Sequence, residues 1–300
     1  MLAEMTGLNK TTVSSLVQEL LEHHFVHEVG YDTSGMGRPA VLLELNPMAG
    51  CIVSAEIGVD FISVIRTNFS AEIVWRHTES TPNGLGQRAI IDRALALLHE
   101  AMEPHGTCAG KLLGMAVGVP GLVDFQTGNL LFAPNLGWRN VPLADILSRH
   151  FEMPVLVDNE ANLAALGEYF FGAAQGYEDV LYISVGVGLG GGILRNGSVF
   201  RGKAGYAGEF GHMTVEPGGR LCNCGNRGCW ETVVSQGAVF RYIQEAVASG
   251  EHSILTDMTG GDLTRLSAAL VAEAARQGDA ATIRALEKTA RYLGLGIASL

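Results

Sequence analysis

The sequence lacks the features that mark a membrane protein or an exported protein. No apolar run reaches the roughly 18 residues that a helix needs to cross a bilayer. The chain starts Met-Leu-Ala-Glu-Met-Thr-Gly, which contains neither the basic start nor the apolar core of a signal peptide. We therefore expect no membrane partner and a cytoplasmic location.

Charged residues are scarce, and positive charge is in particularly short supply. Only 17% of the 300 residues are charged. There are 20 Lys and Arg residues compared with 31 Asp and Glu residues, which gives a formal net charge of −11. Such a chain has no overall attraction for nucleic acid, so any DNA contact must come from a local surface. With 47% apolar residues and 39 glycines, the composition is typical of a well-buried α/β protein of two or three packed units.

Cysteines are few and unevenly placed. Cys51 and Cys108 stand alone among apolar or small residues, and we interpret both as inert core thiols. The other three, Cys222, Cys224 and Cys229, fall within eight residues. In a reducing cytoplasm such a cluster more often binds a metal than forms disulfides.

The first 45 residues differ in pattern from the rest of the chain. Residues 2–8 predict one or two helical turns, and Asn9 can cap a second helix, with Thr11 or Thr12 competing for that role. Apolar residues then recur at helical spacing, at Val13, Leu16, Val17, Leu20 and Leu21. A helix, a turn and a second helix that starts with small polar residues form the plan of a helix-turn-helix, in which the start of the second helix meets base edges.

Two strands are predicted after this helix, at residues 25–29 and 40–45. They flank a tip rich in glycine and serine that contains Arg38 and could be a wing on the phosphate backbone. A small helical hairpin packed on the main body is the alternative, because the segment holds six acidic residues against Lys10 and Arg38. A winged helix-turn-helix normally has a helix before Leu2, so we expect the natural chain to begin earlier.

The remaining residues predict a duplicated α/β domain. The elements expected in its first half are strands at 51–59, 61–67, 71–78 and 112–119 and a helix at about 87–104. A second half opens with a strand at 180–186, followed by a glycine run to Gly192. Two such halves would form a cleft in which a ligand is expected.

The glycine run Gly186-Val-Gly-Leu-Gly-Gly-Gly192 has two interpretations. Glycines let the backbone approach a phosphate or a sugar and direct N–H groups toward it. However, neither a Walker Gly-Lys-Ser/Thr nor a Rossmann helix pattern follows the run, so a tight hairpin in a sheet is the alternative.

The strongest chemical signal lies between residues 208 and 231. His212 is separated by nine residues from the cluster Cys222, Cys224 and Cys229, and one imidazole with three thiolates is the ligand set of a closed tetrahedral zinc site. Four protein ligands leave no open coordination position, so the pattern predicts structural rather than catalytic zinc. Free cysteines in a loop are the alternative.

Hydrogen-bonding groups suited to a polyol surround this cluster in the sequence. Glu209 and Glu231 flank it, and two carboxylates can accept hydrogen bonds from vicinal hydroxyls. Asn135 lies in a polar loop that ends in a tryptophan, and an apolar strand stops at the carboxylates and amides of residues 158–162. Groups between a strand and a helix face a crevice in open α/β sheets, although N-capping by Asp158 or Asn159 is the alternative.

Taken together, these motifs make the sequence similar to the ROK family of repressors and sugar kinases. The matching motifs are Gly118-Val-Pro-Gly121 with Asp124, Ala133–Trp138, Asp158–Asn162 with the helix to Glu168, the glycine run, Ala207–His212, and Cys222–Glu231. The resemblance implies an α/β, actin/hexokinase-like duplicated two-lobe fold, preceded by a partial winged helix-turn-helix. It divides the chain into a DNA-binding domain at 1–46, a first lobe at 47–176, and a second lobe at 177–300 that carries the zinc motif.

The resemblance also implies the residues of each site. Zn²⁺ would be held by His212, Cys222, Cys224 and Cys229. A monosaccharide in the interlobe cleft would contact Asn135, Asn159, Glu160, Glu209, His212 and Glu231. Repressors of the family carry a winged helix-turn-helix that the kinases lack, and its DNA contacts here would be Asn9, Lys10, Thr11, Thr12, Ser14 and Arg38.

Two departures from the kinases of the family argue against catalysis. Their DxGGT-like phosphate loop is replaced here by Glu56-Ile-Gly58-Val-Asp60, and the Asp that serves them as general base is replaced by Glu160. The extra methylene matters, because a misplacement of about 1 Å can cost roughly a hundredfold in rate. We therefore predict a sugar-responsive regulator, a repressor of carbohydrate-use genes similar to xylose repressors. An ATP-dependent sugar kinase with Glu160 as its base is the alternative.

The predicted regulator has operator DNA and a second copy of itself as partners. Sugar binding would close the lobes and change the spacing of paired DNA-binding domains in a homodimer or homotetramer. Family members continue past the predicted last helix, 280–300, so we expect the sequence to be an internal fragment of a longer chain.

Overall fold

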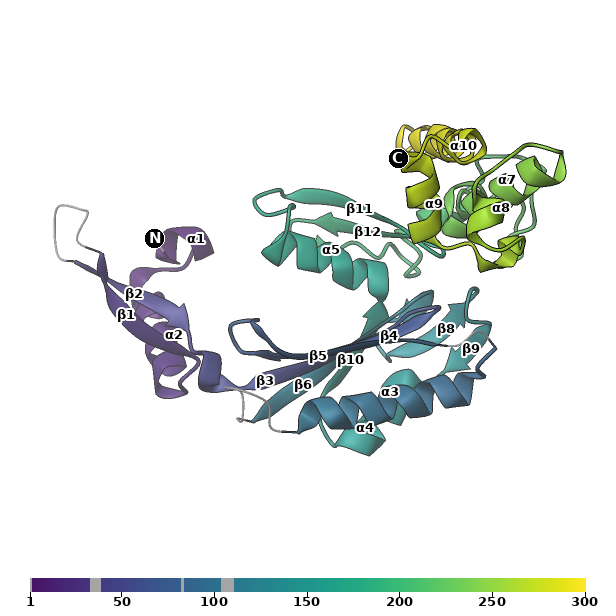
Figure 1. The fold of residues 1–300 in the computed structure, drawn as a ribbon. Coiled ribbons are helices and arrows are strands. Elements are labelled where there is room, and N and C mark those ends of the chain that lie inside the picture. The colour runs from purple at the N-terminus through teal and green to yellow at the C-terminus, as the bar shows by residue number, and fades with distance from the viewer. Residues whose placement is uncertain (1, 33–38, 82–83, 104–110) are drawn as a thin grey trace. The chain divides into compact units, whose positions relative to one another are not determined.

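A computed structural model describes residues 2–32, 39–81, 84–103 and 111–300 (Figure 1). Contacts group the chain into two compact units: Met1–Val119 with Pro142–Val157, and Pro120–Val141 with Asp158–Leu300. Across the described ranges, no helix is both long and apolar enough to cross a membrane. The domain boundaries after residues 46 and 176 stay predictions; by its contacts, the segment 158–176 groups with the second unit.

The first unit begins with two helices and a hairpin, drawn in purple in Figure 1. Their bounds are α1 Leu2–Thr6, α2 Lys10–Glu22, β1 Val26–Asp32 and β2 Ala40–Leu45. The side chain of Asn9 accepts a hydrogen bond from the amide of Thr12 at 2.8 Å, which confirms the predicted cap of α2. β1 and β2 pair antiparallel. Residues 33–38 of the predicted wing tip, Arg38 among them, lie outside the described residues.

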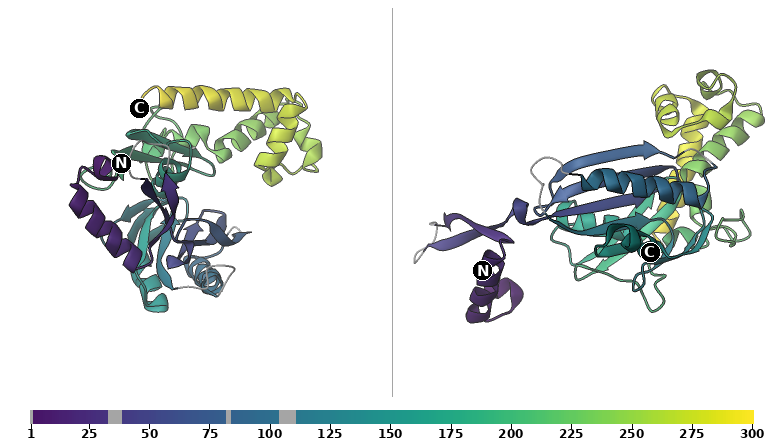
Figure 2. Two further views of the ribbon diagram at one scale, coloured as in Figure 1. Left: turned by 90° about the vertical axis from the view of Figure 1, so that its left-hand side faces the viewer. Right: turned by 90° about the horizontal axis from the view of Figure 1, so that it is seen from below.

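A five-stranded sheet forms the core of the first unit. Its strand order is β10-β6-β3-β4-β5, with β3 parallel to β6 and antiparallel to β4. The bounds are β3 Cys51–Ile57, β4 Phe61–Asn68, β5 Ile73–Ser80, β6 Leu112–Val119, β10 Val155–Asn159, α3 Gln87–Met102 and α4 Leu143–Phe151, with a short 3-10 turn, η1, at Pro47–Ala49. Side chains of β4 alternate between buried and half-buried, as the two faces of a strand require. The helices α3 and α4 cover one face of this sheet (Figures 1 and 2).

Arg66 of β4 is a buried cation that ties the end of α3 to the sheet. It is 1% exposed, and its guanidinium donates hydrogen bonds to the carbonyl oxygens of Ala101 (3.2 Å) and Met102 (3.0 Å), where helix carbonyls lack partners within the helix. Its other terminal nitrogen lies 3.3 Å from the sulfur of Cys51. Cys51 was interpreted as an inert core thiol: the side chain is buried, as expected, but it is not a thiol, because its sulfur is disulfide-bonded. Cys108 lies outside the described residues.

The second unit contains two small antiparallel sheets. The bounds are β7 Leu122–Asp124, β8 Asn129–Ala133 and β9 Trp138–Val141 in one, and β11 Asp179–Val185, β12 Leu189–Arg195 and β13 Ser198–Val199 in the other. The helix α5 (Glu160–Phe171) packs against β12, and the glycines of β12 permit this close approach. A Cβ added at Gly192 would lie 2.9 Å from the Cβ of Ala165, so a side chain there would displace the helix. The glycine run also connects β11 to β12, which pair antiparallel, so it forms the turn and second strand of a hairpin, as the second interpretation expected.

A cluster of helices completes the second unit. The bounds are α6 Glu231–Val234, α7 Gln236–Ala248, α8 Leu255–Met258, α9 Ala268–Arg276 and α10 Ala280–Ile297, with 3-10 turns at Phe210–His212 (η2) and Leu263–Arg265 (η3). The indole of Trp230 is fully buried, and its Nε1 donates a hydrogen bond to the carbonyl oxygen of Tyr292 at 2.9 Å. Gly296 packs directly against the indole ring. Trp230 thus fixes the segment before α6 to the last helix.

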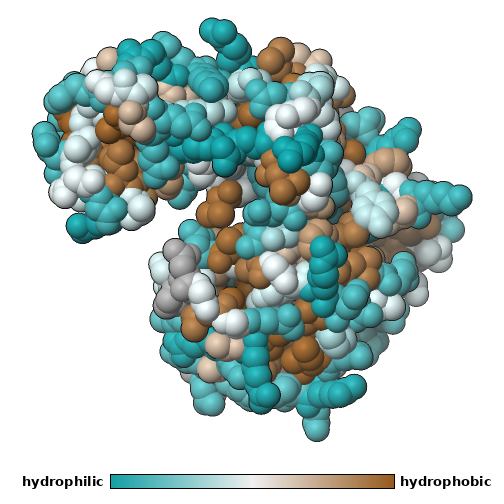
Figure 3. Space-filling view, turned by 90° about the vertical axis from the view of Figure 1, so that its right-hand side faces the viewer, coloured by the Kyte–Doolittle hydropathy of each residue, from teal (hydrophilic) through white to brown (hydrophobic). Residues whose placement is uncertain are grey.

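Hydrophilic and hydrophobic side chains are interspersed over the face drawn in Figure 3. Scattered apolar side chains are normal on the surface of a folded protein. The apolar side chains on this face are therefore no evidence of a ligand site.

Candidate functional site

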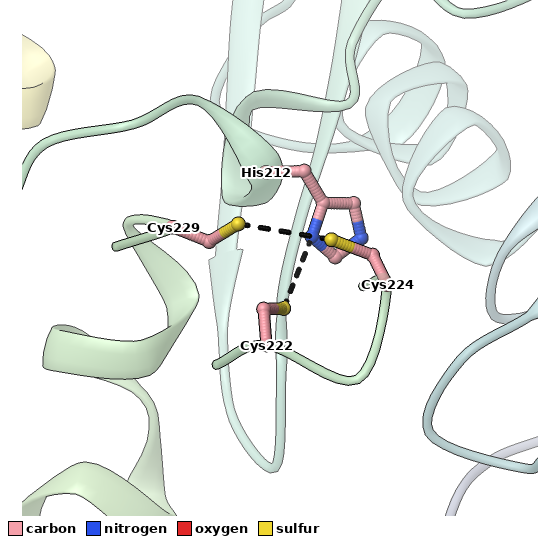
Figure 4. A group of neighbouring side chains, drawn as sticks. All are labelled: His212, Cys222, Cys224 and Cys229. Carbon is pink, nitrogen blue, oxygen red and sulfur yellow. Dashed lines mark hydrogen bonds between the residues drawn. The ribbon is translucent and has the colours of Figure 1, made fainter. Parts of the chain in front are cut away.

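One histidine and three cysteines gather in a single cluster in the second unit. The ligand atoms of His212, Cys222, Cys224 and Cys229 all lie within 4.8 Å of one another. The sulfur of Cys222 lies 3.6 Å from Nδ1 of His212, and the sulfurs of Cys224 and Cys229 lie 3.7 Å apart. Figure 4 shows these four side chains pointing toward one another. The four residues that the sequence predicted as ligands are thus together and could bind a metal ion.

Tight turns bring the three sulfurs to one point. The loop before α6 has no regular element, and single bridges pair Thr214 with Cys229 and Leu221 with Arg227. Gly228 adopts a φ of 71°, and a Cβ at this position would lie 1.8 Å from the carbonyl oxygen of Glu216. Only glycine satisfies both conditions, so the residue before Cys229 is fixed by backbone geometry.

Two thiols of the cluster, those of Cys222 and Cys229, are costly to ionise without a cation. Burial raises the pKa of the Cys222 thiol far above its ordinary value, and burial together with the Cys224 side chain raises the pKa of Cys229. Thiolate is the form that ligates metals, and a bound cation would offset the cost of burying it.

Glu231 is the carboxylate most firmly attached to this cluster. It opens α6 immediately after Cys229-Trp230 and is 8% exposed. Its Oε2 accepts hydrogen bonds from the amide of Leu189 at 2.9 Å and from Nδ2 of Asn135 at 3.3 Å, and its Oε1 lies 3.8 Å from the sulfur of Cys222. The Asn135 oxygen in turn accepts a hydrogen bond from Asn223 at 2.8 Å. The structure therefore joins two predicted sugar residues, Asn135 and Glu231, to the loop of the cluster.

Glu209 lies on the other side of the histidine. Its Oε2 is 4.0 Å from Nε2 of His212, whereas Nδ1 of the same ring faces the cysteines. The imidazole therefore directs Nδ1 to the cysteines and Nε2 to a carboxylate. The predicted role of His212 as a metal ligand is thus compatible with its predicted contact with a sugar. Burial raises the pKa of Glu209; the His212 imidazole opposes this rise, and the carboxylate of Glu231 adds to it.

Asn159 and Glu160 lie where β10 passes into α5. The Asn159 side chain caps α5 by accepting hydrogen bonds from the amides of Ala161 (2.9 Å) and Asn162 (3.1 Å), and its Nδ2 donates to the carbonyl oxygen of Gly121 (2.9 Å). The capping alternative thus holds for Asn159, and its contact with a sugar stays a prediction. Glu160 directs Oε1 toward β12, 3.3 Å from a Cβ added at Gly190. Among the described residues, no hydrogen bond links Asn159 to Glu209 or Glu231.

Asp158 forms an ion pair that sequence reasoning missed. It is 1% exposed, and both of its oxygens accept hydrogen bonds from Arg201, at 2.8 and 2.6 Å. The guanidinium also lies 3.9 Å from the ring centre of Phe125. The N-cap alternative for Asp158 is therefore wrong, since Asn159 is the cap. No sequence signal marks Arg201 as its partner, because the two residues lie 43 positions apart.

The predicted DNA contacts lie at the start of α2, in the first unit. Asn9, Lys10, Thr11 and Ser14 are exposed, and Thr12 is half-buried. Neither α1 nor α2 has a buried residue. Their role in DNA binding stays a prediction.

The sheets, helices and His/Cys cluster define a member of a family that includes both sugar kinases and regulators. Residues 52–300 match the ROK family, and the chain belongs to this family. The predicted actin/hexokinase-like α/β fold is confirmed by the solved structures. A ROK glucokinase from Streptomyces griseus in complex with glucose and AMPPNP has a TM-score of 0.75 and 36% identity, covering 83% of this chain and 78% of that one.

The named repressors among its relatives match over the whole chain. It is 36% identical over 299 residues to the xylose repressor of Caldicellulosiruptor bescii, covering all of this chain and 74% of the relative. It is 35% identical over 302 residues to the xylose repressor of Bacillus subtilis, covering all of this chain and 73% of the relative. The structure of a ROK family transcriptional regulator, a homolog of the E. coli MLC protein, has a TM-score of 0.80 and 28% identity and covers 99% of this chain and 74% of that one.

Proposed function

We propose that this protein is a sugar-responsive transcriptional regulator, a repressor of carbohydrate-use genes, acting in the cytoplasm as a homodimer or homotetramer. The similarity to repressors extends over the whole chain, whereas the glucokinase relatives cover 83–84% of it or less. The observation that carries the sugar-binding part is the position of Glu231. Its carboxylate is fixed by Leu189 and Asn135 beside the His/Cys cluster.

The proposed sugar contacts form a set of acceptors and donors suited to hydroxyl groups. Carboxylates such as Glu209 and Glu231 accept hydrogen bonds from vicinal hydroxyls, and the Nε2 side of His212 can donate one. Holding these groups in place before a ligand arrives reduces the ordering cost of binding. Asn135, Asn159 and Glu160 complete the proposed set.

We propose zinc as the metal of the cluster. With Zn–S bonds of about 2.3 Å and Zn–N bonds of about 2.05 Å, tetrahedral angles place two sulfurs about 3.8 Å apart, and a sulfur and a nitrogen about 3.6 Å apart. The observed separations are 3.7 Å between Cys224 and Cys229 and 3.6 Å between Cys222 and His212. These four residues would hold the ion, which would contribute rigidity to the loop that ends at Glu231.

The first 46 residues are proposed to bind operator DNA as a winged helix-turn-helix. The order α1, α2, β1, β2 and the exposed, capped start of α2 support this proposal. Asn9, Lys10, Thr11, Thr12 and Ser14 would face the DNA. Arg38, outside the described residues, would contact the backbone from the wing.

The family also suggests a sugar kinase, and we propose that this chain is not one. A glucokinase from Halalkalibacterium halodurans is 38% identical over 252 residues, and this similarity is the basis for considering a kinase. Two sequence features oppose it: residues 56–60 lack the phosphate-binding glycine and hydroxyl, and Glu160 replaces the aspartate base.

Thermal melting of the zinc-loaded protein against a panel of aldoses and ketoses, with and without Mg-ATP, tests the proposal. A ligand that binds the native state raises the melting temperature by mass action. We expect one sugar to raise it, Mg-ATP to leave it unchanged, and the Glu231→Gln variant to lose the sugar response. Stabilisation by sugar and Mg-ATP together, followed by turnover, would establish the kinase instead.

A further inference from the structure

The proposed sugar residues come from segments that are far apart in the sequence. Asn159 and Glu160 lie where β10 passes into α5, whereas Glu209 directly precedes η2. Within the described residues, the side chain of Asn159 bonds to Gly121 and to the start of α5, and not to Glu209. A site that uses both segments needs another residue to fix one segment relative to the other.

Arg201, which follows β13, contacts both of these segments. Its guanidinium donates hydrogen bonds of 2.8 and 2.6 Å to the two oxygens of Asp158, the residue directly before Asn159. Oδ1 of Asp158 also accepts a hydrogen bond from the amide of Asn159 at 2.8 Å. The carbonyl oxygen of Arg201 accepts a hydrogen bond from the amide of Ala207 at 3.2 Å, two residues before Glu209. Arg201 therefore joins the two segments, one through its side chain and the other through its backbone.

The guanidinium of Arg201 has little freedom to move. Two parallel hydrogen bonds to one carboxylate fix the plane of the group, and Asp158 is 1% exposed. The ring of Phe125, directly after β7, lies 3.9 Å from the guanidinium carbon. Asn159 is tied to the other end of β7, because its Nδ2 donates to the carbonyl oxygen of Gly121. A third segment thus contacts both Arg201 and Asn159.

Neither helix capping nor stability gives a strong reason for this ion pair. The cap of α5 is Asn159, so Asp158 is not needed to begin the helix. A buried ion pair adds little net stability compared with apolar side chains of similar volume. What a bidentate pair does supply is a fixed geometry between the two residues that form it.

We propose that Arg201 is a positioning residue of the proposed sugar site. This inference deepens the proposed function and rests on it. Through Asp158, Arg201 holds Asn159 and Glu160 at a fixed place relative to Glu209 before a sugar arrives. It does not touch the sugar itself. Without Arg201 the sugar would have to order these segments on binding, and that cost would lower its affinity.

Calorimetric titration of the zinc-loaded full chain tests the inference, with xylose, glucose and fructose as separate probes. Wild type is compared with Arg201→Gln and Arg201→Lys at a temperature at which thermal melting shows every variant to be folded. We expect Arg201→Gln to weaken binding of the preferred sugar about tenfold. Arg201→Lys should lie between the two, because lysine keeps the charge but not the paired hydrogen bonds.

Two further variants separate positioning from stability. The Asp158→Asn, Arg201→Gln double variant has no unpaired buried charge, so it should recover stability while its sugar affinity stays near that of Arg201→Gln. The control is Thr282→Val in α10, a helix that carries none of the proposed sugar residues. Thr282 is fully buried and its hydroxyl donates a hydrogen bond to Asp279 at 2.6 Å. Losing this bond should lower the melting temperature and leave the sugar affinity unchanged, because the folded fraction stays close to one.

Each result decides the inference. Wild-type affinity in Arg201→Gln, or recovery of affinity together with stability in the double variant, would overturn it and leave the proposed function intact. An equal loss of affinity in Thr282→Val would show that affinity follows stability, and would overturn it as well. If wild type bound none of the three sugars, the proposed sugar response would fail, and this inference would fail with it.

Discussion

Asp158 is a buried carboxylate whose charge is balanced by a single residue. Its two oxygens accept hydrogen bonds from Arg201, and Asp158 also accepts one from the amide of Asn159 at 2.8 Å. The pair connects the end of β10 to the segment after β13, and that segment leads to Glu209. A buried ion pair of this kind adds little net stability, yet breaking it is costly because the remaining charge stays buried.

The Arg201→Gln variant should therefore lower the free energy of unfolding by about 2–3 kcal/mol, since the carboxylate of Asp158 is left without its cation. Adding Asp158→Asn should restore part of that loss, because the double variant has no unpaired buried charge. Urea denaturation of the zinc-loaded protein measures both. The control is Arg276→Gln, which breaks an exposed pair and should change stability by less than about 0.5 kcal/mol. Additive losses in the double variant would contradict this account.

At the scale of elements, the loop that carries the cysteines stands out because it has no regular structure of its own. Its ends are fixed, since Thr214 bridges to Cys229 and the buried Trp230 is bonded to α10. Between them, three sulfurs and an imidazole nitrogen converge to within 4.8 Å of one another. A metal is the simplest source of rigidity for such a segment.

Removal of zinc should disorder this loop and abolish sugar binding, because Glu231 follows Cys229 by two residues. The Cys222→Ser, Cys224→Ser double variant should behave like the chelated protein. We expect the melting temperature to fall by at least about 5 °C, roughly 2 kcal/mol in a chain of this size. Metal analysis should give one zinc per chain, with thiol titration exposing three reactive cysteines only after chelation. Unchanged sugar affinity in metal-free protein would show that the metal has no structural role.

At the scale of the whole molecule, the two proposed binding functions are in different units. Every proposed sugar residue lies in Pro120–Val141 or Asp158–Leu300, whereas the proposed DNA contacts lie in Met1–Val119. Variants in one unit should therefore leave the intrinsic binding of the other intact. Any effect of the sugar on DNA affinity must come from a difference in its affinity for two states of the protein.

The Lys10→Gln variant should bind a short DNA duplex more weakly, because one phosphate contact is lost. The slope of the logarithm of the binding constant against the logarithm of the salt concentration should become less steep by about one. The melting response of this variant to sugar should equal that of wild type. Fluorescence anisotropy at several salt concentrations measures the first quantity, with Lys111→Gln as the control because Lys111 is an exposed lysine of the same unit outside the proposed DNA surface. Equal DNA affinities of the two variants would count against α2 as the recognition helix.

Local patterns predicted most of the secondary structure and the grouping of His212 with the three cysteines. The strand expected at 112–119 is observed as Leu112–Val119, and the cap at Asn9 is present, because each depends on neighbouring residues alone. The close spacing of Cys222, Cys224 and Cys229 likewise limited how far apart their sulfurs could lie. The interpretation of Cys51 as a thiol was wrong for the opposite reason, because the residues next to a cysteine do not show whether it forms a disulfide bond.

The sequence by itself determined the family, the residues of the His/Cys cluster and the glycines that its turns require, because these follow from residue type and short spacing. Only the tertiary structure decided which distant groups meet. It paired Asp158 with Arg201, fixed Glu231 between Leu189 and Asn135, and brought Phe125 to the guanidinium of Arg201. Such contacts follow from packing whole elements together, and no local pattern of residues encodes them.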